Sequence, residues 1–228
     1  MSYVWDSLVD LQNHFIETFD SVAKEYKESG MERYNHEGWI NRVWSNDDFR
    51  RAHVDVVDAR EEKGLWMMHV CVFPHLSSNA PIYGFDVIAG HKLMTGAFHD
   101  YSPTTQKDHP MIDYFNEQVE PLQWKREREL PPWAKAIFSD KMMAASAVKE
   151  HSEIDQVVST AKNTLDYFVN NVGQYNQTSR RNPVVFAQNN YAHHQKQNPH
   201  TPRVMKTLGL DSNDVDSFIK KCLFPEIK

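Results

Sequence analysis

The 228-residue sequence lacks the features that mark membrane, exported and disulfide-stabilised proteins. No run approaches the roughly 18 apolar residues of a membrane-spanning helix. The opening MSYVWDSLVDLQ has no basic stretch followed by an apolar core, so we expect no export signal and a cytoplasmic protein. The sequence has two cysteines, Cys71 and Cys222, and their wide separation favours reduced thiols.

Signatures of bound nucleotides and of general nucleic-acid binding are also missing. The eight glycines are scattered, with no Gly-x-Gly-x-x-Gly and no phosphate loop. The formal net charge of −6 argues against a general nucleic-acid binder. No heptad pattern is evident, so we expect a monomer. A redox enzyme built on this chain would therefore need an electron donor from outside it.

Apolar periodicity predicts helices at the start and in the last third of the chain. Residues Tyr3 to Phe19 repeat apolar side chains at helical spacing, and residues Ser152 to Val172 do so over a longer stretch. Shorter helices are expected at 111–119, 184–197, 201–208 and 211–223. The segment 138–148 fits either a helix or a strand.

The middle of the chain is rich in strand-forming residues. Strands are predicted at Phe49–Val57, Leu65–Phe73 and Tyr83–Ala89, with a weaker one at 91–98 and a strand or turn at 40–44. Short connections, including a hairpin turn at 61–64, favour an antiparallel meander. Strands in the middle and helices at both ends predict an α+β fold, in which helices cover both faces of a mainly antiparallel sheet.

Polar side chains inside these apolar strands are the candidate catalytic groups. Asp86 lies within an apolar run, where a carboxylate is costly unless it is paired, hydrogen-bonded or protonated. On an antiparallel sheet, Asp86 could meet His69 from the preceding strand. His53 and Asp55 are two residues apart and therefore share one face of their strand, so these two could converge with His69 and Asp86 from three neighbouring strands. A slip of one residue in the register would break this convergence.

Three interpretations of these groups stay open at this point. A coupled Asp–His unit could hold a proton near neutral pH and act as a general acid while electrons arrive. Asp86 and His69 could instead be a satisfied structural hydrogen-bond pair. The pattern His53-x-Asp55 with a distal histidine is also found in non-haem iron sites, but a jelly-roll host needs about eight strands and the last third here is helical. We therefore expect no metal centre.

Several motifs occur in an order that resembles one enzyme family. They read HVCVFP from His69, PIYGFDVIAG from Pro81, DYSPT from Asp100, ELPPW from Glu129 and TPRVMK from Thr201. Together they resemble the ferredoxin-dependent bilin reductases, over roughly residues 47–224. Within that family the resemblance is closest to the phycocyanobilin:ferredoxin oxidoreductases.

The resemblance implies a fold, a substrate and an electron source. The fold would be a single domain over residues 1–228, a three-layer α/β/α sandwich with a central antiparallel sheet. The substrate would be a bilin, normally biliverdin IXα, held between the sheet and the C-terminal helices. Single electrons from reduced ferredoxin would form bilin radicals, with no permanently bound cofactor. Within the family we expect this chain to resemble the phage-type members that form phycoerythrobilin, which would make it phage-encoded and active in a cyanobacterial host.

The resemblance also implies roles for individual residues. Asp86 matches the family's catalytic aspartate, His69 its partner histidine, and His53-Val-Asp55 its His-x-Glu pair. The phycocyanobilin-forming members carry a glutamate where this chain has Asp55, and that acid is associated with reduction of the D-ring vinyl group. Because aspartate is one methylene shorter, we expect this vinyl group to survive and the product to be phycoerythrobilin. Phycocyanobilin formation, or a protein that only binds bilin, is the alternative.

Further contacts are implied near the C-terminus. Asn198 is expected to face the bilin, and His200 and Arg203 are expected to contact its propionates, since carboxylates seek cations. The family's other propionate-binding arginine has no equivalent within 142–146. Ferredoxins are acidic, so their docking surface should be basic. The candidates for that surface are Lys125, Arg126, Arg128, Arg180, Arg181, Arg203 and Lys206.

Overall fold

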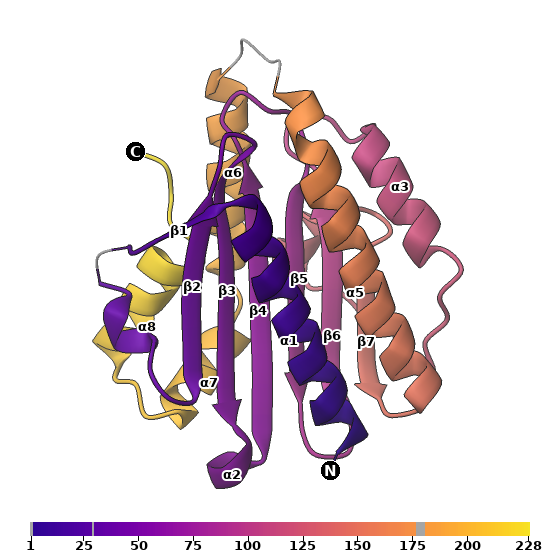
Figure 1. The fold of residues 1–228 in the computed structure, drawn as a ribbon, viewed down its shortest axis with the longest axis vertical. Helices are drawn as coiled ribbons and strands as arrows, with labels where there is room; N and C mark the ends of the chain where they lie inside the picture. The colour runs from indigo at the N-terminus through magenta and orange to yellow at the C-terminus, as the bar shows by residue number, and fades with distance from the viewer. Residues whose placement is uncertain (1, 29, 177–180) are drawn as a thin grey trace.

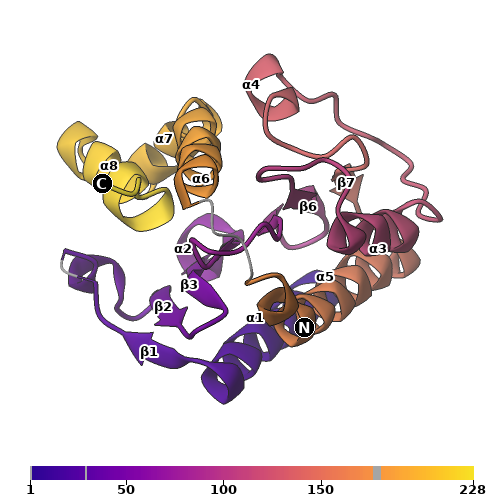
Figure 2. The same ribbon diagram turned by 90° about the horizontal axis from the view of Figure 1, so that it is seen from above.

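A seven-stranded sheet runs through the centre of the molecule, with helices on both of its faces (Figures 1 and 2). This computed structural model describes residues 2–28, 30–176 and 181–228. The strands lie in sequence order from β1 to β7, and every neighbouring pair is antiparallel. The predicted α+β fold, with an antiparallel meander between helices, is confirmed.

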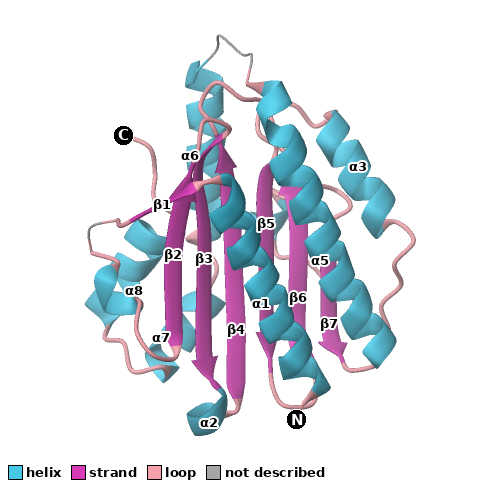
Figure 3. Ribbon diagram, viewed as in Figure 1, coloured by secondary structure: helices cyan, strands magenta, loops and turns pink. Residues whose placement is uncertain are grey.

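The strand boundaries agree with the sequence pattern in the middle of the sheet and depart from it at the edges (Figure 3). Edge strand β1 (Lys24–Tyr26) was not expected, because its three residues are polar and largely exposed. The weak strand predicted at 91–98 begins later and ends later, so it includes His99 and Asp100. The remaining strands are β2 (Trp39–Ser45), β3 (Phe49–Ala59), β4 (Leu65–Pro74), β5 (Ile82–Ala89), β6 (Met94–Ser102) and β7 (Met143–Val148).

The connection between β3 and β4 is a single helical turn rather than a simple hairpin turn. This turn, α2, spans Arg60–Lys63 and ends at Gly64, whose φ is 60°. A left-handed backbone at this position favours glycine, which has no Cβ to clash with the following carbonyl. The turn reverses the chain and sets the pairing of β3 with β4.

Three helices cover one face of the sheet: α1 (Tyr3–Val22), α3 (Pro110–Val119) and α5 (His151–Asn171). Figure 1 shows them in front of the strands. Ser2 caps the start of α1, where its hydroxyl accepts a hydrogen bond from the Trp5 backbone N–H, 3.4 Å away. The apolar stripe predicted for α1 is buried against the sheet, through Val4, Leu8, Leu11, Phe15 and Phe19.

The opposite face is covered by the C-terminal helices α6 (Arg181–Gln195), α7 (His200–Thr207) and α8 (Ser212–Ser217). The single helix predicted at 211–223 continues from α8 as a π-helical turn, Phe218–Leu223. Asp211 caps α8, because its side chain accepts hydrogen bonds from the backbone N–H groups of Asn213 and Asp214. The shorter elements are α4 (Pro132–Lys135) and the 3₁₀ turns Glu32–Tyr34 and Val172–Tyr175.

Strand alternation divides the buried residues into two cores, one on each face. Val54, Val70 and Phe85 pack beneath α1 and α5, whereas Met67 and Cys71 face the C-terminal helices. Cys71 and Cys222 are both buried and free. Among the described residues, no helix combines the length and the apolar character needed to cross a bilayer.

Candidate active site

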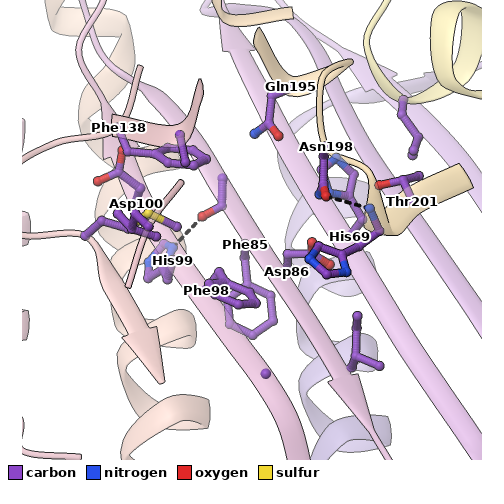
Figure 4. Close-up of a pocket in the computed structure, with 18 of the residues that line it drawn as sticks. His69, Phe85, Asp86, Phe98, His99, Asp100, Phe138, Gln195, Asn198 and Thr201 are labelled. Carbon is purple, nitrogen blue, oxygen red and sulfur yellow. Dashed lines mark hydrogen bonds between the residues drawn. The ribbon is translucent and has the colours of Figure 1, made fainter. Parts of the chain in front are cut away.

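A pocket of about 330 Å³ opens between the sheet and helices α6 and α7. This volume falls at the lower end of the range of about 300–1,000 Å³ that is usual for ligand sites. Figure 4 shows side chains of the pocket wall pointing into this space from the sheet and from the C-terminal segments. Most of the wall is apolar or aromatic, from Met67, Phe85, Ile88, Phe98, Leu130, Pro131, Trp133, Phe138, Met142, Val204, Met205, Leu223 and Phe224.

Three ionisable side chains form a row across the pocket floor. Asp55 on β3 lies opposite His69 on β4, and His69 lies opposite Asp86 on β5. Directly paired residues of antiparallel strands point to the same face, so this register places all three groups side by side. All three line the pocket, and Figure 4 shows the Asp86 carboxyl group next to the His69 ring. The register thus brings together Asp55, His69 and Asp86 of the predicted cluster, whereas its fourth member, His53, does not line the pocket.

Burial sets the charge state of this row. It raises the pKa of Asp86 to about 7, because the charged carboxylate loses its hydration in the sheet. Burial, together with the positive charge of Arg51, lowers the pKa of His69 to about 4. At neutral pH the imidazole is therefore neutral and the carboxyl group can carry a proton. Within the described residues no hydrogen bond joins the two side chains, and His69 Nε2 is buried without a partner.

Asp55 differs from Asp86 because protein groups hold one of its oxygens. The Trp39 indole N–H donates to Asp55 Oδ1 at 2.7 Å, and the Asn41 amide donates to the same oxygen at 3.1 Å. Burial raises the pKa of Asp55 to about 7, the Trp39 hydrogen bond acts in the opposite direction, and the nearby Asp86 raises the pKa further. Asp55 is therefore a second acid with a raised pKa, fully buried at the β3 end of the row.

Comparison with known proteins identifies the family. A family model described as "Ferredoxin-dependent bilin reductase" matches residues 4–225. The chain belongs to the ferredoxin-dependent bilin reductases. It is similar to the phycocyanobilin:ferredoxin oxidoreductase of Synechococcus sp. (strain CC9605), with 30% identity over 190 residues, covering 81% of this chain and 74% of the relative. The corresponding protein of Prochlorococcus marinus (strain MIT 9515) is 27% identical over 180 residues, covering 77% and 72%.

Solved structures agree with this assignment. A structure titled for PcyX is 37% identical with a TM-score of 0.74, and the match covers 97% of this chain and 99% of that one. Tomato phytochromobilin synthase, solved in complex with biliverdin, shares the fold with a TM-score of 0.73 at 15% identity, over 94% of this chain and 81% of that one. This bilin reductase is therefore an oxidoreductase that takes its electrons from ferredoxin.

Of the three C-terminal residues predicted to contact the substrate, two line the pocket and one does not. Asn198 and His200 line the pocket, and the Asn198 side-chain oxygen accepts from the His200 backbone N–H at 3.0 Å. Arg203 lies one turn into α7, is exposed and does not line the pocket. His53 is fully buried beside the pocket rather than on its wall.

His53 instead supports the hydrogen-bond network around Asp55. Its Nε2–H donates to Asn41 Oδ1 at 2.7 Å, and the Asn41 amide in turn donates to Asp55. Burial and the charge of Arg51 lower the pKa of His53 well below its usual value. No group of three or more His, Cys, Asp or Glu side chains in the described parts of the chain is arranged to hold a metal ion.

Arg128 is a pocket residue that sequence reasoning assigned only to the basic surface. It lies over the Phe98 ring, and its Nη2 is 3.3 Å from His200 Nε2. Gly96 makes room for this arrangement, because a Cβ there would lie 2.8 Å from Phe98 and 3.7 Å from the guanidinium. No carboxylate of the described residues forms an ion pair with Arg128. A cation thus stands unpaired at the wall of an apolar pocket.

Asp100 is a further acid on the pocket wall, fully buried, for which no catalytic role was expected. It accepts hydrogen bonds from the Ser102 hydroxyl at 2.7 Å and from the backbone and hydroxyl of Ser139. These bonds tie β6 to the segment before β7 and oppose the effect of burial, which raises the pKa of Asp100 to about 6. The fully bonded carboxyl group is better suited to structure than to proton delivery.

Proposed function

We propose that this bilin reductase converts biliverdin IXα to phycoerythrobilin, in sequential electron and proton transfers through bilin radicals. The observation that carries the proposal is the row Asp55–His69–Asp86 on the floor of an apolar pocket. Each electron that enters an extended tetrapyrrole makes it more basic, so an acid must be within reach at each step. Ferredoxin supplies the electrons, and carboxyl groups with raised pKa values supply the protons.

Asp86 is the proposed principal donor. No protein group of the described residues hydrogen-bonds its carboxyl group, and its pKa of about 7 keeps part of it protonated near neutral pH. After Asp86 gives its proton to the reduced bilin, solvent restores that proton through the open side of the pocket. His69, neutral at this pH, is placed between the two acids and can pass a proton between them. The surrounding apolar wall excludes water and protects the radical.

The cation at the pocket wall supports a substrate with carboxylates. A biliverdin carries two propionate groups, and Arg128 can hold one of them in a two-pronged hydrogen bond. Burial and the charges of Arg128 and Arg203 lower the pKa of His200, so its neutral ring accepts a hydrogen bond from the guanidinium at 3.3 Å and helps to orient it. Arg203, which was expected at this position, lies outside the pocket wall and is better placed for a partner protein.

This substrate contact can be tested by measuring biliverdin affinity. We expect Arg128→Leu to weaken binding roughly 10-fold, because a desolvated carboxylate loses its charged partner. Arg126→Leu is the matched control, since Arg126 lies in the same segment but is exposed and does not line the pocket. Equal affinity of the two variants would reject the role of Arg128, and a loss in Arg203→Leu alone would restore the sequence-based assignment.

The product follows from the length of the acid at position 55. Asp55 extends one methylene less than glutamate into the pocket, and its Oδ1 is held by groups of β2. We infer that it does not deliver a proton to the D-ring vinyl group, so reduction takes place elsewhere on the bilin. Phycocyanobilin is the second candidate, because the phycocyanobilin:ferredoxin oxidoreductases are similar in sequence. The two products are isomers, so each requires the same electrons and protons.

An anaerobic assay decides between these products. The full chain is incubated with biliverdin IXα, ferredoxin and a ferredoxin-reducing system, and the bilins are separated by HPLC and identified by absorbance. We expect a product that keeps the D-ring vinyl group. Asp55→Glu is the matched variant, and it should add product with a D-ring ethyl group. An ethyl product from the unaltered chain would establish phycocyanobilin instead, and absence of any bilin reduction would reject biliverdin as the substrate.

The ferredoxin surface is proposed to lie beside α7. Arg203 and Lys206 are exposed on this helix, and Arg126 and Arg128 are exposed in the neighbouring segment, whereas Arg180 falls outside the described residues. We expect turnover to fall as salt rises while bilin affinity stays unchanged, because salt screens attraction between oppositely charged surfaces. Turnover that is independent of salt would count against this surface.

A further inference from the structure

We propose that Trp39 is a positioning residue for Asp55: its indole N–H holds Oδ1 against β2 and leaves Oδ2 as the oxygen that exchanges a proton with the pocket. This role goes beyond the row of acids and imidazole described above. Its consequence for catalysis rests on the proposed function, whereas the contact itself can be tested without substrate.

The geometry of the Asp55 carboxyl group carries this proposal. Oδ1 accepts two hydrogen bonds, from Trp39 Nε1 at 2.7 Å and from Asn41 Nδ2 at 3.1 Å. No donor among the described residues bonds to Oδ2. The two donors come from alternate positions of β2, and Asn41 is paired directly with Asp55 in the β2–β3 register. The two oxygens of one carboxyl group therefore have different surroundings, which fixes the side chain's orientation.

Packing holds Trp39 in the required position. Its ring is 5.4 Å from the Tyr34 ring and 5.2 Å from the Phe218 ring, centroid to centroid, and the residue is 6% exposed. Trp39 does not line the pocket that contains Asp55. It can therefore influence a bilin only through Asp55, as a positioning residue rather than a catalytic one.

The indole also affects the protonation of Asp55. An N–H donor stabilises the ionised carboxylate, and here it acts against burial and against the nearby Asp86. Asn41 is neutral and receives a hydrogen bond from His53, so β2 brings no charge of its own to this oxygen. The titratable or charged groups that surround Asp55 on the packed elements are Arg51 and His53 on β3, His69 on β4, Asp86 on β5 and Cys222 in the C-terminal π-helical turn.

Trp39→Phe is the direct test, because it removes the N–H and keeps an aromatic ring against Tyr34 and Phe218. Trp66→Phe is the matched control. Trp66 is a buried tryptophan of β4 that packs in the core on the opposite face, and its Nε1 has no hydrogen-bond partner in the described residues. Both variants lose the same atoms, but only the first loses a hydrogen bond to Asp55.

The first measurement is an infrared pH titration of the protein without bilin. The carboxylic C=O band that Asp55→Asn abolishes is assigned to Asp55. In Trp39→Phe this band should persist to higher pH by roughly one unit, since the ionised carboxylate loses the N–H donor that stabilises it. Trp66→Phe should leave the band's titration unchanged. An Asp55 titration that is the same in Trp39→Phe and in the unaltered chain would overturn the proposal.

The second measurement is turnover with biliverdin, on the same variants. We expect kcat of Trp39→Phe to fall roughly 3–10-fold with KM unchanged, because a freed carboxyl group spends less time aimed at the bilin. In an Asp55→Asn background, Trp39→Phe should cause no further loss, since the two residues act as one unit. An equal loss in both backgrounds would overturn the positioning role. If the unaltered chain does not reduce biliverdin, the proposed function fails, while the infrared titration still tests Trp39.

Discussion

The two faces of the sheet contain similar residues but use them differently. On the face under α1, α3 and α5, His99 is bonded at both ring nitrogens, to the Gly84 carbonyl and the Thr164 hydroxyl, each at 2.7 Å. On the face under the C-terminal helices, His69 has a buried Nε2 without a partner in the described residues. Burial lowers the pKa of both imidazoles to about 4. Burial alone therefore does not separate a structural histidine from a candidate catalytic one, whereas the hydrogen-bond partners do.

The same contrast applies to the helix layers. The α1 and α5 side is a continuous apolar core, in which Phe15 packs on Tyr83 and Phe85. The C-terminal side is interrupted by the pocket and by buried polar groups. Packed apolar side chains contribute free energy of folding, and a cavity forgoes part of that contribution. We infer that the first face stabilises the protein and that the second tolerates this cost for catalysis.

The largest loss of turnover that would test this contrast between the two faces is expected at Asp86. Asp86→Asn should reduce bilin turnover by roughly 10²–10⁴-fold, because the principal acid is lost, while bilin binding is kept. Single-turnover absorbance should show a bilin radical that accumulates or decays slowly. The control is Asp113→Asn, which neutralises an exposed acid on α3. Unimpaired turnover in Asp86→Asn would remove the acid from the mechanism.

A smaller loss of turnover is expected at His69. His69→Leu should slow reduction roughly 10–100-fold, since proton exchange along the row loses its middle group. The melting temperature should hardly change, because no described protein group depends on the His69 ring for a hydrogen bond. A large loss of stability without loss of turnover would make His69 a structural residue, like its counterpart on the other face.

The same substitution on the opposite face should have the opposite result. His99→Leu should destabilise the protein by about 1–3 kcal/mol, because the Gly84 carbonyl and the Thr164 hydroxyl lose a partner in a dry environment. Urea unfolding provides the measurement, with turnover per folded molecule as the second readout. Part of His99 borders the pocket, but its polar atoms face α5 and β5. A dominant catalytic defect in this variant would contradict the division between the faces.

The smallest effect concerns the dependence of stability on pH. The pKa of Asp86 is raised in the folded state from its usual 3.8 to about 7, so the folded chain binds the proton more tightly than the unfolded chain. Its contribution is therefore fully present below about pH 4 and is lost as pH rises through about 7. Asp86→Asn removes this penalty, so relative to the unaltered chain it should gain stability between pH 4 and pH 8. Parallel unfolding curves for both proteins at the two pH values provide the check.

Most helices and strands could be predicted from the sequence, because their signals are local. The apolar spacing of α1 marks the same five residues that are buried against the sheet. Alternation in β3 and β4 indicates which side chains share a face. Local signals fail where pairing with another strand determines the conformation. β7 has no clear pattern of its own, and it is a strand because it pairs with β6. Edge strand β1 likewise exists through its pairing with β2.

The residues of the candidate site also divide into those that the sequence indicated and those that only the structure revealed. Composition and strand pattern singled out Asp55, His69 and Asp86, and a family resemblance assigned their roles. The sequence could not place Arg128 at the pocket, because its neighbour there, His200 of α7, is distant in the chain and no local pattern indicates their contact. It also could not show that Trp39, sixteen positions before Asp55, donates to that acid.

By itself, then, the sequence determined the central strands of the sheet and which side chains point the same way along each of them. Only the tertiary structure decided that Asp55, His69 and Asp86 meet in one row, since that depends on the register between strands. The physical reason is that alternation is a property of one strand, set by backbone geometry. Register is set by hydrogen bonds between strands and by the packing of both faces, to which residues far apart in the chain contribute.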